Sequence, residues 1–299
     1  MMVKVNVLMS TYCGDHFLRE QITSILAQKG VDVELTVRDD GSSDNTCEIL
    51  EEFGNKKYLS WYKGNNLGPA HSFLYLLKQS MNADYYAFSD QDDFWESDKL
   101  KVAVDMLDEF EDVPALYFSR TQLTNSQLVP TSVVQINPYL TFGESLVYEF
   151  VPGCTMVMNK KLRNIINRYT PGYLPMHDVW IYSVALAVGS KVCFDTMPHI
   201  LYRQHERNTI GQGYSAWHEW ARRYKRLVHS EHSRYRRALE IKKGYNDLMP
   251  FENQSVLDAF IAAKQSLGKR IKMCMDSRYM CADKTTQNLF RLSLLMNIY

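Results

Sequence analysis

The acidic run at residues 90–93 is the part of this sequence best suited to chemistry. Asp90, Asp92 and Asp93 place three carboxylates within four residues, and these repel one another unless a cation or water relieves the charge. Hard divalent ions take oxygen ligands and often bridge a protein carboxylate to a substrate phosphate. The alternative is a solvated acidic turn, but the run directly follows an apolar stretch and precedes Phe94-Trp95. The sequence therefore predicts a metal site on the loop that leaves a buried strand.

Two other polar clusters have the chemistry of a nucleotide site. Asp39 and Asp40 precede Gly41, where a carboxylate can accept hydrogen bonds from a pyrimidine imide or a ribose hydroxyl. Turn formation ahead of the glycine is the alternative for one of the two. Tyr12, in the cluster 10–12, has a ring that can stack on a base, and the alternative is an ordinary aromatic residue of the core or its rim.

Two residues in the second half of the chain are candidates for catalysis or phosphate contact. Asp178 follows His177 at the expected start of an amphipathic helix. It can act as a general base for a sugar hydroxyl, or it can simply cap the helix. His205 lies close to Arg203 after a short apolar stretch; a lone histidine is usually structural, whereas one beside an arginine can meet a metal or a diphosphate.

The elements that must position these residues alternate between strand and helix. Four short apolar stretches predict strands, and apolar residues at helical spacing predict a helix after each of the first three. The strands are expected at 3–9, 33–37, 58–62 and 85–88. This order predicts right-handed crossovers and a largely parallel sheet. Because ligands bind beyond the carboxyl ends of such strands, the clusters at 10–12, 39–40 and 90–93 are expected to share one edge.

The pattern is looser beyond residue 100. A strand is expected at 115–119, and the segment 121–150, which contains Pro130 and Pro138, is expected to be loop-like. Helices are then expected at 161–169 and from His177, followed by short strands at 191–194 and 200–203. From about residue 214 the chain is expected to be helical and basic.

The composition limits the classes of protein to which the chain can belong. It has 299 residues, 45% of them hydrophobic, which suits one large domain or a domain with a small annex. Lys and Arg number 34, as do Asp and Glu, so the chain has no net charge and no nucleic-acid partner is expected. Its six cysteines form no CxxC pair, which disfavours a zinc ribbon and suits free thiols in a reducing cytosol.

Several motifs and segments of other classes are missing. The chain has no GxGxxG and no GxxxxGK[ST], so dinucleotide and P-loop sites lack their phosphate loops. It also has no signal-peptide stretch and no run of about 18 apolar residues. These absences predict a cytoplasmic protein and leave open a location at the inner face of the cell membrane.

Together these pieces resemble the family 2 glycosyltransferases, which share a GT-A fold. The resemblance covers residues 3–210, and the segments that carry it are 5–12, 39–46, 66–70, 89–95, 177–180 and 202–205. The last three segments are similar to the rhamnosyltransferase-like branch, which builds bacterial capsule, O-antigen and cell-wall polysaccharides. One departure is Cys13, which stands where many relatives carry Asn.

The resemblance implies an architecture and a nucleotide-sugar site. The fold would be α/β and Rossmann-like, with a mostly parallel central sheet flanked by helices. A catalytic domain would occupy residues 1–210, and a helical C-terminal extension would occupy 211–299. Ser10, Tyr12 and Asp40 would hold the nucleobase and ribose, with Asp39 close by and Asp90 facing the ribose. The other members of the nucleotide-sugar site would be Thr11, Gly68 and Arg203.

The resemblance also implies the reaction. Asp92 would ligate Mn²⁺ or Mg²⁺ on the diphosphate of a nucleoside-diphosphate sugar, either dTDP-rhamnose or a UDP-hexose, and His205 would lie near the metal. Asp178 would take the proton of an acceptor hydroxyl on a glycan or lipid-linked oligosaccharide, in an inverting single displacement. Arg203 or His205 would stabilise the leaving nucleoside diphosphate.

Two other functions are compatible with parts of the pattern. A sugar-nucleotide pyrophosphorylase also uses an α/β sheet and a metal, but it needs a glycine-rich phosphate loop, which residues 10–14 do not form. A non-catalytic scaffold subunit of a glycan-synthesis complex would not need the expected carboxylates, all of which are present.

The segment 217–240 is a candidate for contact with a membrane. Its seven basic residues face only three acidic ones, and several aromatic and aliphatic residues fall at helical spacing. The basic residues are Arg222, Arg223, Lys225, Arg226, Arg234, Arg236 and Arg237. A basic amphipathic helix of this kind can lie on an anionic bilayer. The alternative is that the apolar stripe packs on the catalytic domain and the arginines are solvated.

Overall fold

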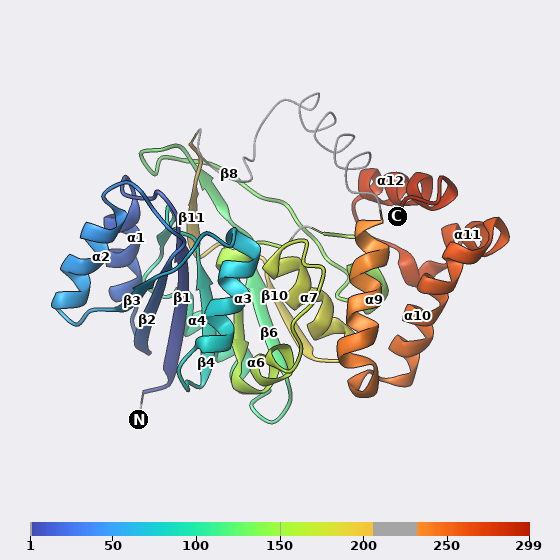
Figure 1. Ribbon diagram of the computed structural model, residues 1–299, viewed down its shortest axis with the longest axis horizontal. Coiled ribbons are helices and arrows are strands. Elements are labelled where there is room, and N and C mark those ends of the chain that lie inside the picture. The colour runs from blue at the N-terminus through green and yellow to red at the C-terminus, as the bar shows by residue number, and fades with distance from the viewer. Residues whose placement is uncertain (1, 150, 206–231) are drawn as a thin grey trace.

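The structure, a computed structural model, describes residues 2–149, 151–205 and 232–299. Within these residues, seven strands form one sheet across the molecule (Figure 1). In spatial order they are β10 (Lys191–Asp195), β6 (Ala115–Ser119), β9 (Val157–Asn159), β4 (Tyr85–Ser89), β1 (Lys4–Thr11), β2 (Asp32–Asp39) and β3 (Ser60–Lys63). Four of the six pairings are parallel, and β9 runs antiparallel to both of its neighbours. The prediction of a mostly parallel sheet is confirmed.

β1 lies inside the sheet and pairs in parallel with β2 on one side and with β4, the central strand, on the other. Thr11 lies opposite Asp39 and Met9 lies opposite Ser89, so the three strands end at the same edge. Side chains of β1 alternate between the two faces of the sheet, since Val5 belongs to one core cluster and Leu8 to the other. This register brings the three polar loops predicted from the sequence to one edge.

Helices cover both faces of the sheet. One cluster contains residues of α1 (Leu18–Leu26), α2 (Thr46–Asn55) and α4 (Lys99–Asp108). The other contains residues of α3 (Pro69–Gln79), α6 (Lys160–Asn167) and α7 (His177–Ala187). Pro69 is the first residue of α3, as predicted, because a proline there gives up only an N–H that has no helical partner.

The segment 121–150 corrects the prediction of a loop. It contains β7 (Gln122–Thr124), β8 (Pro130–Val133) and the one-turn helix α5 (Phe142–Ser145). With β5 (Phe94–Trp95) and β11 (Ile200–Arg203), the two strands form a second sheet of order β5-β11-β7-β8. β11 was predicted, whereas β7 and β8 are only three and four residues long and β8 is mostly exposed, so these two lack the apolar alternation by which a strand is recognised.

Among the described residues that follow position 231, four helices stack at one end of the sheet, coloured orange to red in Figure 1. They are α9 (Ser233–Tyr245), α10 (Phe251–Ala262), α11 (Leu267–Cys274) and α12 (Lys284–Leu295). Ile241, Phe260 and Phe290 belong to the same cluster as Phe88 of β4. None of the helices within the described residues is long and apolar enough to cross a membrane.

The described end of the segment 217–240 packs on the rest of the protein. Arg237 is fully buried, and its guanidinium donates to Ser145 O at 2.9 Å and to Glu149 Oε1 at 3.1 Å. Arg234 donates to Val147 O at 3.1 Å, and the guanidinium of Arg236 lies 4.1 Å from the centre of the Tyr173 ring. These three arginines therefore contact the protein itself, so they neither face a membrane nor are solvated as the alternative expected. Residues 217–231, which hold the predicted apolar stripe, lie outside the described residues.

Arg237→Leu is expected to lower the free energy of unfolding by about 2–3 kcal/mol. The substitution removes a buried guanidinium together with its hydrogen bonds to Ser145 and Glu149, and the Glu149 carboxylate loses the nearer of two arginines, Arg234 being the other. Urea unfolding followed by circular dichroism measures the effect. Lys242→Leu is the matched control, because Lys242 pairs with Asp258 on the surface and should cost less than about 1 kcal/mol. Equal losses in the two variants would contradict the packing role of Arg237.

Candidate active site

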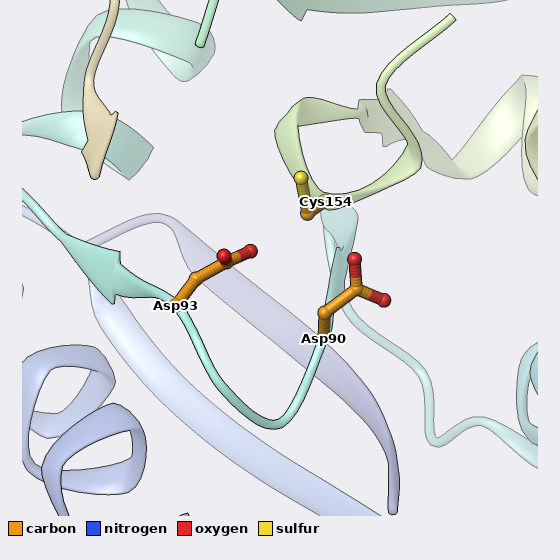
Figure 2. A group of neighbouring side chains, drawn as sticks. All are labelled: Asp90, Asp93 and Cys154. Carbon is orange, nitrogen blue, oxygen red and sulfur yellow. The ribbon is translucent and has the colours of Figure 1, made fainter. Parts of the chain in front are cut away.

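The acidic loop that follows β4 directs its carboxylates into the protein. Figure 2 shows Asp90 and Asp93 leaving one loop and pointing toward Cys154 on a neighbouring turn. Ligand atoms of the three residues lie within 4.8 Å of one another. Burial, followed by the charges of Asp92 and Asp178, raises the pKa of Asp90 to about 7. Burial also raises the pKa of Asp93 well above its usual range. The loop therefore concentrates negative charge that a cation would relieve.

Asp92 faces His205 at the opening of this loop. Its Oδ2 atom lies 2.9 Å from Nε2 of His205, and both side chains are partly exposed. A carboxylate and an imidazole can both bind a divalent cation such as Mn²⁺ or Mg²⁺, for which oxygen ligands predominate. On the buried side of the same loop, beside Asp90 and Cys154, the Oδ2 atom of Asp93 has no hydrogen-bond partner among the described residues, so a cation near the loop would also offset its charge. The residues present thus fit the predicted metal.

Arg203 lies beneath the acidic loop and holds its backbone. Its N–H donates to Asp93 Oδ1 at 3.2 Å, and its Nε donates to the carbonyl oxygen of Asp92 at 2.8 Å. The guanidinium also pairs with Glu20 of α1 and donates to Ser126 O. The side chain is only 2% exposed, so these contacts position the loop, whereas the sequence predicts a contact with the diphosphate.

Asp178 lies across from the acidic loop, as the second residue of α7. Its Oδ1 atom accepts a hydrogen bond from Val179 N at 2.7 Å, and burial raises its pKa to about 6. The N-cap of the helix is Met176, so Asp178 does not cap it. A Cβ atom on Gly153 would lie 3.2 Å from Asp178 Oδ2, so this glycine leaves room beside the carboxylate. The side chain of Asp178 can therefore face a ligand and accept a proton.

His177 supports the start of α7 through its ring. The ring stacks on Phe73 of α3 at 4.1 Å and lies 5.3 Å from Phe88 of β4. It is 3% exposed, and burial lowers its pKa to about 3, so the imidazole is neutral. This packing joins Asp178 to the two elements that also carry the predicted nucleotide site.

The two carboxylates after β2 are buried and differ in their partners. Asp39 accepts hydrogen bonds from the backbone N–H groups of Gly41 and Ser42, at 3.2 and 3.0 Å, in a turn where Gly41 has a φ of +91°. It therefore has the geometry of the turn-forming alternative. Asp40 pairs with Arg38 and accepts from the N–H groups of Leu67 and Gly68, both at 2.9 Å. Asp40 thus fixes the loop that carries Gly68.

The end of β1 is tied to its neighbours on both sides. The Ser10 hydroxyl lies 2.6 Å from the Ser72 hydroxyl of α3, to which Arg38 donates at 2.8 Å. The ring of Tyr12 is 52% exposed and can receive a base. Cys13 has a φ of +48°, a conformation that Asn tolerates better than most residues, and its N–H donates to Ser42 Oγ at 2.8 Å. The departure at Cys13 therefore keeps the turn.

Gln91 joins the nucleotide side to the acidic loop. Its Oε1 atom accepts from Thr11 Oγ1 at 2.7 Å and from Tyr12 N at 2.8 Å, and its Nε2 donates to Tyr12 O at 3.2 Å. A Cβ atom on Gly14 would lie 2.3 Å from Oε1 of Gln91, so a larger residue there would displace the Gln91 amide from these hydrogen bonds. The sequence does not single out Gln91, and its position inside the acidic run is the one signal that points to it.

Two buried residues next to the acidic loop are also missed by sequence reasoning. Lys99 is 1% exposed, and its Nζ lies 3.6 Å from the centre of the Trp95 ring. Burial lowers its pKa to about 7, against the attraction of Cys154 and Asp93. Burial, with the charges of Asp93 and Asp90, raises the pKa of the Cys154 thiol well above its usual range. Neither residue stands in a motif that spacing alone identifies.

Known proteins share this fold and are similar to parts of this sequence. The crystal structure of S. aureus TarS 1–349 in complex with UDP-GlcNAc superposes with a TM-score of 0.60 at 17% identity, covering 99% of this chain and 82% of that one. The glucosyltransferase WfgD of Escherichia coli, named for UDP-Glc and α-D-GlcNAc-diphosphoundecaprenol, is 28% identical over 161 residues, or 54% of this chain and 62% of WfgD. The predicted GT-A fold is confirmed.

The family itself is shown by two matches. The sequence profile described as Glycosyl transferase family 2 matches residues 6–165. The dTDP-rhamnosyl transferase RfbG of Shigella flexneri is 33% identical over 259 residues, which are 80% of this chain and 84% of RfbG. The matched residues include the loops after β1, β2 and β4 that meet at one edge of the sheet. The chain therefore belongs to glycosyltransferase family 2.

Proposed function

We propose that this glycosyltransferase transfers a sugar with inversion from a nucleoside-diphosphate sugar to a hydroxyl of a glycan or lipid-linked oligosaccharide in bacterial surface polysaccharide synthesis. The observation that carries the proposal is the partly buried Asp178 facing the acidic loop, so that its charge raises the pKa of Asp90. The similarity to RfbG over four-fifths of the chain favours dTDP-rhamnose as the donor, with a UDP-hexose as the alternative.

In the proposed reaction, Asp178 acts as the general base. Its carboxylate takes the proton of the acceptor hydroxyl as the oxygen attacks the anomeric carbon, and the nucleoside diphosphate leaves from the opposite face of the sugar. One displacement suffices, so no covalent intermediate on the enzyme forms. A base with a pKa of about 6 is ionised at neutral pH and is still basic enough to receive a proton.

The acidic loop would hold the donor diphosphate through a cation. Asp92 and His205 would bind Mn²⁺ or Mg²⁺, with Asp90 on the ribose side. A bound divalent cation offsets the charge that develops on a leaving diphosphate. Arg203 would act indirectly, because its Nε–H holds the backbone of Asp92. The positions of Asp92, His205 and Arg203 support this proposed binding of the diphosphate.

The loops after β1 and β2 would form the nucleotide site. Tyr12 would stack on the base, and the hydroxyls of Ser10 and Thr11 line the same edge. Asp40 would shape the site by fixing the backbone at Gly68. Asp39 would support it through the turn at Gly41. In this proposal the two carboxylates act mainly through the backbone that they order.

A lipid-linked acceptor would place the enzyme at the cytoplasmic face of the cell membrane. WfgD is named for a diphosphoundecaprenol-linked acceptor, and this similarity supports the proposal. The catalytic domain would comprise residues 1–210, and the helical extension 211–299 would contact the acceptor or the membrane.

The two other functions fit these groups less well. A non-catalytic scaffold subunit would need neither the acidic loop 90–93 nor the base Asp178. A pyrophosphorylase would need a glycine-rich phosphate loop at residues 10–14, where the Tyr12 N–H instead donates to Gln91.

Asp178→Asn is expected to lower kcat about 10²–10⁴-fold while donor affinity stays unchanged. The amide keeps the shape of the side chain but cannot accept a proton. Turnover is measured by release of nucleoside diphosphate, and donor affinity by isothermal titration calorimetry. Asp105→Asn is the control, because Asp105 is an exposed residue that pairs with Lys101 on the surface. Loss of donor affinity with kcat intact would exclude the role of base.

The rate should rise with pH through about 6. Burial raises the pKa of Asp178, so the carboxyl is protonated and inactive below that value and ionised above it. A plot of log kcat/KM against pH should therefore have a slope of about +1 below the apparent pKa and level off above it. A profile that stays flat from about pH 5 to 7 would show that Asp178 does not supply the titrating base.

Asp92→Ala is expected to reduce metal-dependent turnover about 100-fold or more while the fold is kept. The substitution removes a carboxylate that would bridge the cation to the diphosphate. Activity is titrated with Mn²⁺, and a thermal melt without metal checks the fold. Asp112→Ala is the control, because Asp112 is fully exposed and away from the loop. Activity like that of the unmodified enzyme at every Mn²⁺ concentration would reject the assignment.

A further inference from the structure

The last two helices expose an unusual share of the apolar surface. Nineteen large hydrophobic side chains are exposed among the described residues, and seven of them fall between residues 267 and 296. These are Leu267, Ile271, Met275, Met280, Leu292, Leu295 and Met296. About a tenth of the chain therefore holds more than a third of its large exposed apolar side chains, which marks this region as a contact surface.

Each helix arranges these residues as a stripe. In α11 and at its C-cap, Leu267, Ile271 and Met275 are spaced four residues apart and so share one face, and they are 53%, 45% and 76% exposed. In α12, Leu292 and Leu295 share a face with Met296 at its C-cap. Other residues attach the helices to the core, Met273 in α11 and Phe290 and Leu294 in α12, so the exposed stripes are not needed for that packing.

The same region is strongly basic although the whole chain is neutral. Residues 264–299 contain seven Lys or Arg and only two Asp or Glu, so the rest of the chain has an excess of acidic residues. Lys269, Lys272 and Lys284 are exposed, and none of them forms a salt bridge with a described residue. Cations beside an apolar stripe are the composition of a helix that lies on a bilayer. This positive charge is complementary to anionic headgroups.

We propose that the α11–α12 surface, defined by these two stripes and the lysines beside them, docks on the surface of an anionic lipid bilayer. The apolar side chains would enter the headgroup region, and the ammonium groups would pair with lipid phosphates. Arg234, Arg236 and Arg237 of α9 take no part, because they contact residues of the protein itself. This proposal rests on the proposed membrane contact of the helical extension and narrows it to α11 and α12, and it does not depend on the identity of the donor sugar.

Co-sedimentation with vesicles tests the proposal. The full chain is mixed at low salt with vesicles of phosphatidylcholine alone or of phosphatidylcholine with phosphatidylglycerol. Binding is expected on the anionic vesicles, about 10-fold or more tighter than on the neutral ones, and it should weaken as salt is added. Absence of binding to the anionic vesicles at low salt would overturn the proposal.

A matched pair of variants locates the surface. Ile271→Glu with Met275→Glu should lower vesicle affinity about 10-fold or more. Val113→Glu with Met197→Glu alters the net charge equally at apolar residues exposed elsewhere, and it should lower the affinity much less. Equal losses in the two variants would overturn the proposal, and so would loss of binding only when Arg222, Arg223, Lys225 and Arg226 become Glu.

A second pair of variants and a measurement of self-association distinguish loss of lipid binding from misfolding and from dimer formation. If Ile271→Glu with Met275→Glu melts early, Lys269→Gln with Lys272→Gln replaces it, because these changes leave the apolar packing intact and should still weaken binding. Light scattering of the full chain reports self-association. A dimer that is lost in Ile271→Glu with Met275→Glu, together with no vesicle binding by the unmodified protein, would make the surface a contact between copies and overturn the proposal.

Discussion

Repulsion among partly or fully buried carboxylates is the constraint around which the active site is built. Asp90, Asp92 and Asp93 share one loop, and Asp178 faces them from another element, so each negative charge raises the cost of the next. Basic side chains and hydrogen-bond donors near the loop offset this repulsion. Lys99 lies beneath the loop, Arg203 holds its backbone and His205 meets Asp92. A bound divalent cation would neutralise more of this negative charge and would also bind the diphosphate of the donor.

The sheet makes this crowding possible because it supplies rigid ends for the loops. β1 is paired on both sides, so the residues that follow β1, β2 and β4 are fixed relative to one another. Gln91 then joins two of these loops through three hydrogen bonds. Asp40 does the same between β2 and the loop before α3. The polar side chains of the proposed nucleotide site therefore serve as much to hold the backbone as to contact a ligand.

The sequence predicted the elements that local patterns specify. Apolar strands, helical periodicity and Pro69 placed most elements of the main sheet, and the strand order brought the three acidic and polar loops to one edge. The short strands β7 and β8 were missed because they are fixed by tertiary hydrogen bonds rather than by their own apolar pattern. Cys154 and Lys99 were missed for a related reason, since only the fold brings them beside Asp93. Within the Asp39-Asp40 motif, the sequence alone does not show which of the two adjacent carboxylates forms the turn, and the structure assigns the turn to Asp39.

The hydrophobic cluster that runs from the sheet into the C-terminal helices has a consequence for cooperativity. Phe88 of the sheet, Trp180 of α7 and Phe260 of α10 belong to one continuous core, so the helices cannot leave without exposing apolar surface of the catalytic part to water. Because the helical end and the sheet share this core, we expect the loss of one to destabilise the other. A chain shortened before α9 would be an aggregation-prone fragment rather than a minimal enzyme.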